Sequence, residues 1–192
     1  MIRHLNTLKN EDWFYRPWIL LGTGPSLDNF VFNDWKDHNI VAIYDAYFAC
    51  DYVDVLFVSD RWDDPVYGNN HYWRNDNIKF VATRNENIIR IGEQKNIVMW
   101  DYDCDERRIF YDQDRYPCSN TSSLAVLWLG TMGVKEIKTF GIDGGKGVSK
   151  YVSEEYRKGL DTLPGGIDYD FTHENGGVFG HANILEINLI KQ

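Results

Sequence analysis

The chain has 192 residues, with 20 basic against 29 acidic side chains and a formal net charge of -9. This length suits one domain with a sizeable core, and the acidic balance argues against nucleic acid as a partner. No run of about 18 apolar residues occurs and the first residues lack a secretory apolar core, so we expect no transmembrane segment and a cytoplasmic location. Three widely spaced cysteines predict neither a disulfide framework nor a Cys-rich zinc site.

Short β-type runs alternate with polar or helix-compatible segments, which is typical of an α/β fold. Several runs are continuously apolar, as expected of parallel strands buried on both faces. We predict strands at residues 18–23, 39–45, 54–60, 78–84, 96–102 and 136–143, and helices at 26–37 and 121–133. The expected fold is a Rossmann-like open, mostly parallel sheet with helices on both faces, in one domain spanning residues 1–192.

Residues 144–180 differ from the rest of the chain because they are rich in glycine and show no regular pattern. A long loop of this kind is often functional, so we expect a lid or insertion over the sheet edge. A disordered insertion is the alternative.

A glycine-rich turn follows the first predicted strand, where Gly22, Thr23 and Gly24 lead to Ser26. Glycine lets a ligand approach the backbone closely, and a helix start favours anions, so the turn suggests a site for a nucleotide phosphate or ribose. Leu27 stands where the dinucleotide fingerprint needs its third glycine, and the Lys-Ser/Thr pair of a P-loop is missing. A simple tight turn is the alternative.

Aspartates close three of the predicted strands, at Asp45, Asp60 and Asp143. Ligands of open parallel sheets bind beyond the carboxyl ends of the strands, and an acid about 20 residues after the first glycine often holds a ribose hydroxyl. Asp45 lies 45 minus 22, or 23, residues after Gly22. The alternative is that these aspartates begin turns or cap the following helices.

The second candidate site is the polar run from Ser119 through Asn120, Thr121 and Ser122 to Ser123, at the start of the later helix. Its hydroxyl, amide and backbone N–H groups suit a phosphate or carboxylate, although ordinary capping explains one or two of them.

Two histidines, His173 and His181, lie in the segment 168–183, with Asp168, Asp170 and Glu174 nearby. Their spacing does not fit a helical metal motif, so no metal site is expected. One histidine near a cleft is a candidate general base, with a structural or surface role as the alternative.

Three segments taken together resemble the bacterial lipo-oligosaccharide sialyltransferases. They are GTGPSL at 22–27, NTSSLAVLWLGTMGVKEIKTFGID at 120–143 and GGVFGH at 176–181, whereas residues 48–115 match in strand order alone. A broader resemblance, through G-x-G-P-S-L and the Gly-x-Asp strand end, is to the archaeal-type hydroxymethylpterin diphosphokinases.

The sialyltransferase resemblance implies an enzyme that transfers a sialic-acid-like sugar from a nucleotide-linked donor to a glycan acceptor hydroxyl, with no metal or other cofactor. His181 would take the proton from the acceptor, and Tyr151 and Tyr156 are the candidates that assist phosphate departure. The remaining residues implied in donor binding are Gly22, Thr23, Gly24, Ser26, Asp45, Asp60, Asn120, Thr121, Ser122, Ser123 and Asp143.

Three positions depart from that family, since Thr23 and Asp45 replace asparagines and Ser119 replaces an arginine. One alternative is an ATP-dependent diphosphokinase with magnesium held by Asp60 and Asp143. Another is a non-catalytic nucleotide-binding module. The sequence leaves a homo-oligomer open.

Overall fold

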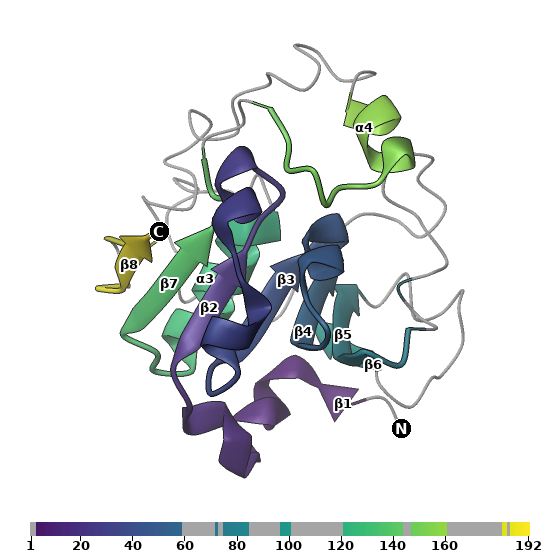
Figure 1. Ribbon diagram of the computed structural model, residues 1–192. Coiled ribbons are helices and arrows are strands. Elements are labelled where there is room, and N and C mark those ends of the chain that lie inside the picture. Colours follow the sequence, from purple (N-terminus) through teal and green to yellow (C-terminus); the bar gives the residue numbers. More distant parts are fainter. Residues whose placement is uncertain are drawn as a thin grey trace, which may run out of the picture.

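The computed structural model describes residues 3–58, 72, 75–84, 97–100, 121–143, 147–160, 182–183 and 185–192. Within these ranges eight strands form one sheet in the order β1-β6-β5-β4-β3-β2-β7-β8, and every pairing is parallel (Figure 1). The strands are β1 Arg3–His4, β2 Trp18–Leu21, β3 Asn39–Ile43, β4 Val53–Val58, β5 Ile78–Arg84, β6 Ile97–Trp100, β7 Glu136–Phe140 and β8 Asn188–Lys191.

The centre of the sheet is apolar because β2, β3 and β4 are buried along their whole lengths. From β2 the chain builds the sheet outward through β3, β4, β5 and β6, and then returns to add β7 on the other side of β2. This change of direction makes the carboxyl ends of β2 and β7 the topological switch point. The predicted α/β, Rossmann-like fold and all six predicted strands are confirmed.

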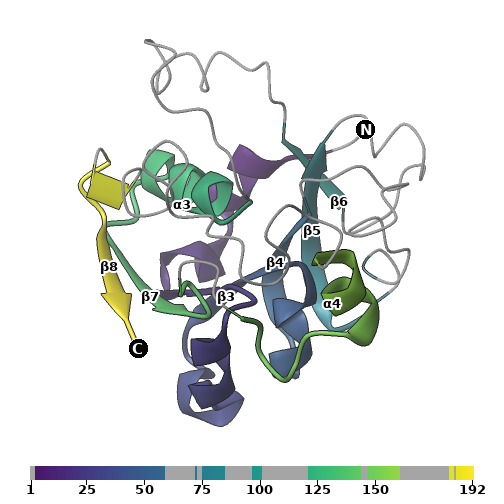
Figure 2. The same cartoon turned by 90° about the horizontal axis from the view of Figure 1, so that it is seen from above.

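The helical segments are η1 Leu5–Asn10, η2 Asp12–Tyr15, η3 Pro25–Asn29, η4 Phe32–Trp35, η5 Tyr44–Ala49, α3 Thr121–Thr131 and α4 Glu154–Leu160. Helical segments lie on both faces of the sheet (Figure 2), and α4 lies beyond the carboxyl ends of the strands (Figure 1). On one face Trp128 of α3 packs against the rings of Trp18 and Phe57. On the other face Phe30 and Trp35 pack against Phe140 of β7.

The predicted helix at 121–133 is confirmed as α3. Most of its side chains are buried, so it is apolar on nearly every side rather than amphipathic. A Cβ on Gly130 would lie 2.6 Å from Cδ1 of Ile187, which shows how closely the segment before β8 covers the outer side of α3.

The predicted helix at 26–37 is wrong, because two short 3₁₀ segments, η3 and η4, occupy this region. Val31 between them is extended, with φ -120° and ψ 103°. Tertiary contacts decide the local structure here, since Ser26 and Asp28 bond to residues beyond position 140 and Phe30 is buried. The expected helix dipole at the glycine turn is therefore missing.

Two edge strands, β1 and β8, were not predicted. Both are short, and β8 is exposed at its two ends and half-buried at its two central residues, so neither shows the continuous apolar run of a central strand. Each is held by parallel pairing to one neighbour, β1 to β6 and β8 to β7. The local sequence does not predict such strands, because they form through pairing with a neighbouring strand.

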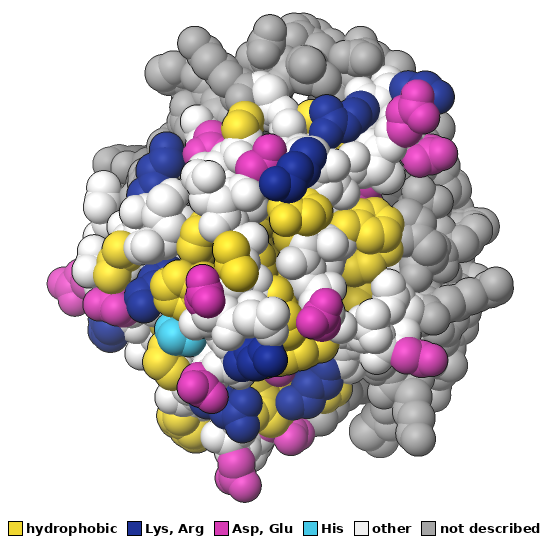
Figure 3. Space-filling model, in the orientation of Figure 1, with side chains coloured by type: hydrophobic (Ala, Val, Ile, Leu, Met, Phe, Trp, Pro, Cys, Tyr) yellow, Lys and Arg dark blue, Asp and Glu magenta, His cyan; other side chains and the backbone are white. Residues whose placement is uncertain are grey.

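The face seen in Figure 3 carries positive and negative side chains intermixed, with hydrophobic ones between them. In the ranges that the structure describes, no helix has both the length and the apolarity needed to cross a bilayer. The prediction of a single domain over residues 1–192 stays a prediction.

Candidate active site

The carboxyl ends of β2 and β7 bring the predicted glycine turn against the loop that follows Phe140. The N–H of Gly22 donates to the carbonyl of Phe140 at 2.8 Å, and the N–H of Gly24 donates to that of Gly141 at 2.9 Å. These bonds extend the β2–β7 pairing past the ends of both strands. The turn therefore sits at the switch point, where open sheets bind their ligands.

The glycines of this turn are needed for the contact between the two loops. A Cβ on Gly22 would overlap the carbonyl oxygen of Gly141, and a Cβ on Gly24 would lie 2.6 Å from Oδ2 of Asp143. Gly141 has a φ of +70°, which side-chain-bearing residues rarely adopt. Close packing thus accounts for the glycines, and their role toward a nucleotide stays a prediction.

Ser26 and Asp143 join the same two loops through their polar groups. The N–H of Ser26 donates to Oδ2 of Asp143 at 2.6 Å, and Oγ of Ser26 accepts from the N–H of Gly141 at 2.7 Å. Oδ1 of Asp143 lies 3.5 Å from Nζ of Lys191 in β8. Ser26 and Asp143, both predicted site residues, thus bond directly to each other, and the two loops that carry them form one wall of the candidate site.

The described part of the predicted lid, residues 147–160, lies against this wall. The N–H of Ser149 donates to the carbonyl of Thr23 at 2.8 Å, and its Oγ donates to Oδ1 of Asp28 at 2.5 Å. The N–H of Lys150 also donates to Asp28, and Arg157 donates to the carbonyl of Ser149. The hydrogen bond from Ser149 is the main cause that lowers the pKa of Asp28 below its ordinary value.

Asp45 is 1% exposed and lies at the end of β3, in the first turn of η5. Its Oδ1 accepts a hydrogen bond of 2.6 Å from the hydroxyl of Tyr72. Its Oδ2 accepts from both the N–H and the hydroxyl of Ser153. Burial, with the carboxylate of Asp45 as the second cause, raises the pKa of Tyr72 and keeps this hydroxyl a donor.

Tyr44 occupies a strained backbone position beside Asp45, with φ +45°. Its hydroxyl accepts a hydrogen bond of 3.1 Å from Oγ1 of Thr121, the first residue of α3. Its ring lies 6.0 Å from that of Tyr156 and 6.4 Å from that of Tyr72, measured between centroids. Backbone strain of this kind is found at functional sites, where the surrounding structure maintains it.

The described predicted residues thus lie in the loops that follow β2 and β7, in η5 after β3, at the start of α3 and in the segment 147–160 that contains α4. Ser123 is fully buried, whereas Ser122 is half-buried. Tyr151 is half-buried with Nζ of Lys150 5.0 Å from its ring centroid. Asp60, Asn120 and His181 lie outside the described residues, as do His173 and its neighbouring acids.

Sequence reasoning missed five residues that build the site, namely Asp28, Tyr44, Tyr72, Ser149 and Ser153. Tyr44 and Ser153 each had a usable signal, because one directly precedes the strand-end Asp45 and the other directly precedes a Glu-Glu helix start. Tyr72 has no such signal.

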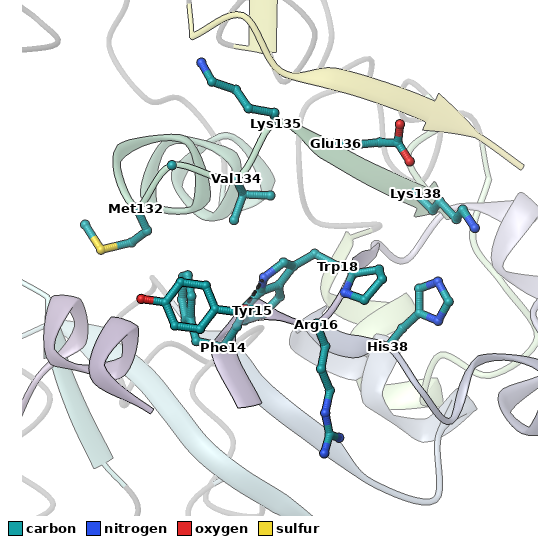
Figure 4. Close-up of a pocket in the computed structure, with 12 residues that line it drawn as sticks. Phe14, Tyr15, Arg16, Trp18, His38, Met132, Val134, Lys135, Glu136 and Lys138 are labelled. Carbon is teal, nitrogen blue, oxygen red and sulfur yellow. Dashed lines mark hydrogen bonds between the residues drawn. The ribbon is translucent and has the colours of Figure 1, made fainter. Parts of the chain in front are cut away.

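A pocket of about 560 Å³ lies at the opposite, amino end of the sheet (Figure 4). Its lining includes Trp18 and Glu136, the first residues of β2 and β7, and His38, which directly precedes β3. It contains none of the predicted site residues. Among the described residues, no group of three or more His, Cys, Asp or Glu side chains is placed to hold a metal ion.

The fold is shared with two bacterial sialyltransferases. CstII from Campylobacter jejuni, in complex with the substrate analogue CMP-3FNeuAc, is 16% identical, with a TM-score of 0.56 over 92% of this chain and 80% of its own. The structure of CstII with a trisaccharide acceptor and CMP has a TM-score of 0.55 at 16% identity, again over 92% of this chain and 80% of its own. The monofunctional α-2,3-sialyltransferase Cst-I from Campylobacter jejuni gives 0.54 at 15% identity, over 92% of this chain and 75% of its own.

The predicted resemblance to sialyltransferases is therefore confirmed at the level of the fold. No protein-family model and no curated protein matches the chain.

Proposed function

We propose that the protein is a glycosyltransferase that transfers a sialic-acid-like sugar from a cytidine-nucleotide donor to a glycan acceptor hydroxyl. The observation that supports this proposal is that the described members of the predicted donor-binding set lie along the carboxyl edge of the sheet, in a fold shared with CMP-bound sialyltransferases. Fold alone does not define an activity, so the residues at this edge supply the argument.

The reaction is a direct displacement. The acceptor oxygen bonds to the anomeric carbon of the sugar as the bond from that carbon to the phosphate oxygen breaks, with the electron pair leaving on the phosphate. His181 takes the proton of the acceptor hydroxyl as general base.

The departing phosphate needs hydrogen-bond donors placed where its charge develops. Tyr151 and Tyr156 are the candidates from the 147–160 segment, with Thr121 and Ser122 at the start of α3. The close approach of Tyr156 to Tyr44, which itself bonds to Thr121, supports a shared cluster for this task. Such donors stabilise the leaving group without a metal ion in this scheme.

The carboxylate of Asp45 is compatible with an anionic donor. A bare negative charge beside phosphate would be unfavourable. Its two oxygens accept hydrogen bonds from Tyr72 and Ser153 and the residue is 1% exposed, so the carboxylate faces donors of the protein itself. The departure from asparagine at this position is therefore compatible with a donor whose phosphate lies elsewhere along the edge.

Thermal-shift measurements with CMP, UMP and AMP test the nucleotide, and incubation of CMP-sialic acid with lactose in the presence of EDTA tests transfer. We expect stabilisation by CMP of about 2.7 kcal/mol when its concentration is about 100-fold above Kd. Absence of stabilisation by any nucleotide would contradict the proposal.

The variant His181→Ala separates binding from catalysis. It is expected to keep the CMP-induced shift and to lose transfer by about 100-fold or more, the usual contribution of a positioned base. Unchanged transfer in this variant would favour a different base, and a nucleotide shift with no transfer in the wild type would favour a non-catalytic binding module.

A further inference from the structure

The polar contacts of Asp45 extend beyond the sheet to the backbone of Tyr156. Ser153 directly precedes α4, and its hydroxyl accepts a hydrogen bond of 3.2 Å from the N–H of Tyr156. A serine at this position caps a helix through the same contact. The hydroxyl of Ser153 also donates to Oδ2 of Asp45, so one hydroxyl links the end of β3 to Tyr156.

The carboxylate has both of its oxygens committed to this arrangement. Oδ1 accepts from the hydroxyl of Tyr72 at 2.6 Å, and Oδ2 accepts from Ser153, whose N–H lies at 3.1 Å. Tyr72 and Asp45 are each 1% exposed. Because the carboxylate is buried among these donors, a ribose hydroxyl could reach it only by displacing the packed groups that cover it, which would disturb hydrogen bonds to a charged acceptor.

We infer that Asp45 is a positioning residue that places Tyr156 through Ser153, rather than a ligand of the donor ribose. The tyrosine reached in this way lies beside Tyr44, and Tyr44 connects to Thr121 of α3. The placement of Tyr156 next to Tyr44 and Thr121, the group proposed to meet the phosphate, would thus depend on a carboxylate that does not itself touch the substrate. The catalytic part of this inference rests on the proposed function.

The first test uses the protein without nucleotide and does not depend on its activity. Hydrogen exchange at the amide of Tyr156 is measured by NMR in the wild type and in Asp45→Ala, Ser153→Ala and Ser153→Thr. In both alanine variants the amide of Tyr156 is expected to exchange about tenfold faster or more. Asp45→Ala removes the charged acceptor that holds the Ser153 hydroxyl, and Ser153→Ala removes the capping hydroxyl itself. Ser153→Thr keeps the hydroxyl and is expected to restore slow exchange.

Unchanged exchange in Ser153→Ala would overturn the inference, and this variant decides the matter even where Asp45→Ala does not fold. Thr131→Ala is the control. It removes a hydroxyl bonded to the carbonyl of Trp128 in α3, away from the segment 147–160, and is expected to leave exchange at the Tyr156 amide unchanged.

The second test compares binding of CMP and 2′-deoxy-CMP. A positioning role predicts that Asp45→Ala weakens both nucleotides by the same factor and lowers the transfer rate, kcat, as Ser153→Ala does. A ribose contact predicts a loss for CMP alone, which would overturn the inference. If the protein binds no cytidine nucleotide at all, the proposed function fails while the exchange experiment still decides the role of Asp45.

Discussion

Ser26 and Asp143 stand 117 positions apart in the chain, and the N–H of Ser26 donates a hydrogen bond of 2.6 Å to Oδ2 of Asp143. The bond closes the loop after β2 onto the loop after β7. Because these two strands flank the switch point, it defines one wall of the candidate active site. The wall is a product of packing between loops, and its stability is open to measurement.

Gly22→Ala is expected to destabilise the protein by about 3 kcal/mol, at the upper end for overpacking, because the added methyl group meets backbone atoms of Gly141 that cannot easily move. Gly133→Ala is the control. Its φ of +94° makes alanine unfavourable by about 1–2 kcal/mol, but nothing lies within 4 Å of the added atom. Urea unfolding compares the two, and an equal loss at both positions would contradict the close contact at Gly22.

Tyr72→Phe is expected to lower the free energy of unfolding by about 1–3 kcal/mol, since it removes a buried hydrogen-bond donor to the carboxylate of Asp45. Tyr52→Phe deletes the same hydroxyl from an exposed bond to the carbonyl of Lys36 and is expected to cost less than about 0.5 kcal/mol. Thermal unfolding at neutral pH measures both. A similar effect of the two substitutions would show that the bond to Asp45 contributes little.

These contacts mark the limit of what the sequence could predict. The central strands were predicted because apolar runs such as Ile19 to Leu21 encode burial on both faces directly. The helix at 26–37 was wrong because its polar groups bond to residues more than 100 positions away, which local propensity does not register.

The candidate site divides in the same way. Strand-end aspartates and the Gly-x-Gly turn were found because parallel strands bring their carboxyl ends to one edge. The partners of Asp45, at separations of 27 and 108 residues, follow from how the segments pack. Position along the chain therefore predicted where the site lies, and tertiary structure decides which groups its carboxylates face.

Ser149→Ala is expected to loosen residues 147–160, because it removes the 2.5 Å bond to Asp28. The segment contains Lys150, Arg157 and Lys158, so trypsin reports its opening. Cleavage there is expected to become about tenfold faster, in line with the loss of one charge-assisted hydrogen bond. Thr131→Ala, which removes a hydroxyl bonded to the carbonyl of Trp128 at the far end of α3, should leave the cleavage rate unchanged.

The buried carboxyl of Asp54, near the start of β4, is expected to make the stability of the sheet depend on pH. This residue is 6% exposed, accepts a hydrogen bond of 2.9 Å from the N–H of Ile40 and lies 3.8 Å from Nζ of Lys79. Burial raises the pKa of Asp54 above its ordinary value of 3.8, against the opposing effects of Ile40 and Lys79. Burial also lowers the pKa of Lys79, so loss of hydration outweighs the attraction between the two charges on both sides of the pair.

A carboxyl whose pKa is raised by folding binds its proton more tightly in the folded state. Its favourable contribution is complete below the unfolded pKa of about 3.8 and is lost as the pH rises through the higher folded pKa. Asp54→Asn does not titrate. The stability of the wild type relative to this variant should therefore increase as the pH falls from 7 toward 4, measured by urea unfolding at each pH.

Lys79→Gln strengthens this test, because the ammonium of Lys79 lowers the pKa of Asp54. Removal of the ammonium is expected to raise the pKa of Asp54 further. The pH at which the stability difference between the proteins without and with the Asp54→Asn substitution begins to change should therefore be higher in the Lys79→Gln background. A difference between wild type and Asp54→Asn that stays constant with pH, or that shrinks on acidification, would contradict burial as the dominant effect. The same result would mean that the bond from Ile40 and the charge of Lys79 outweigh the loss of hydration at this end of β4.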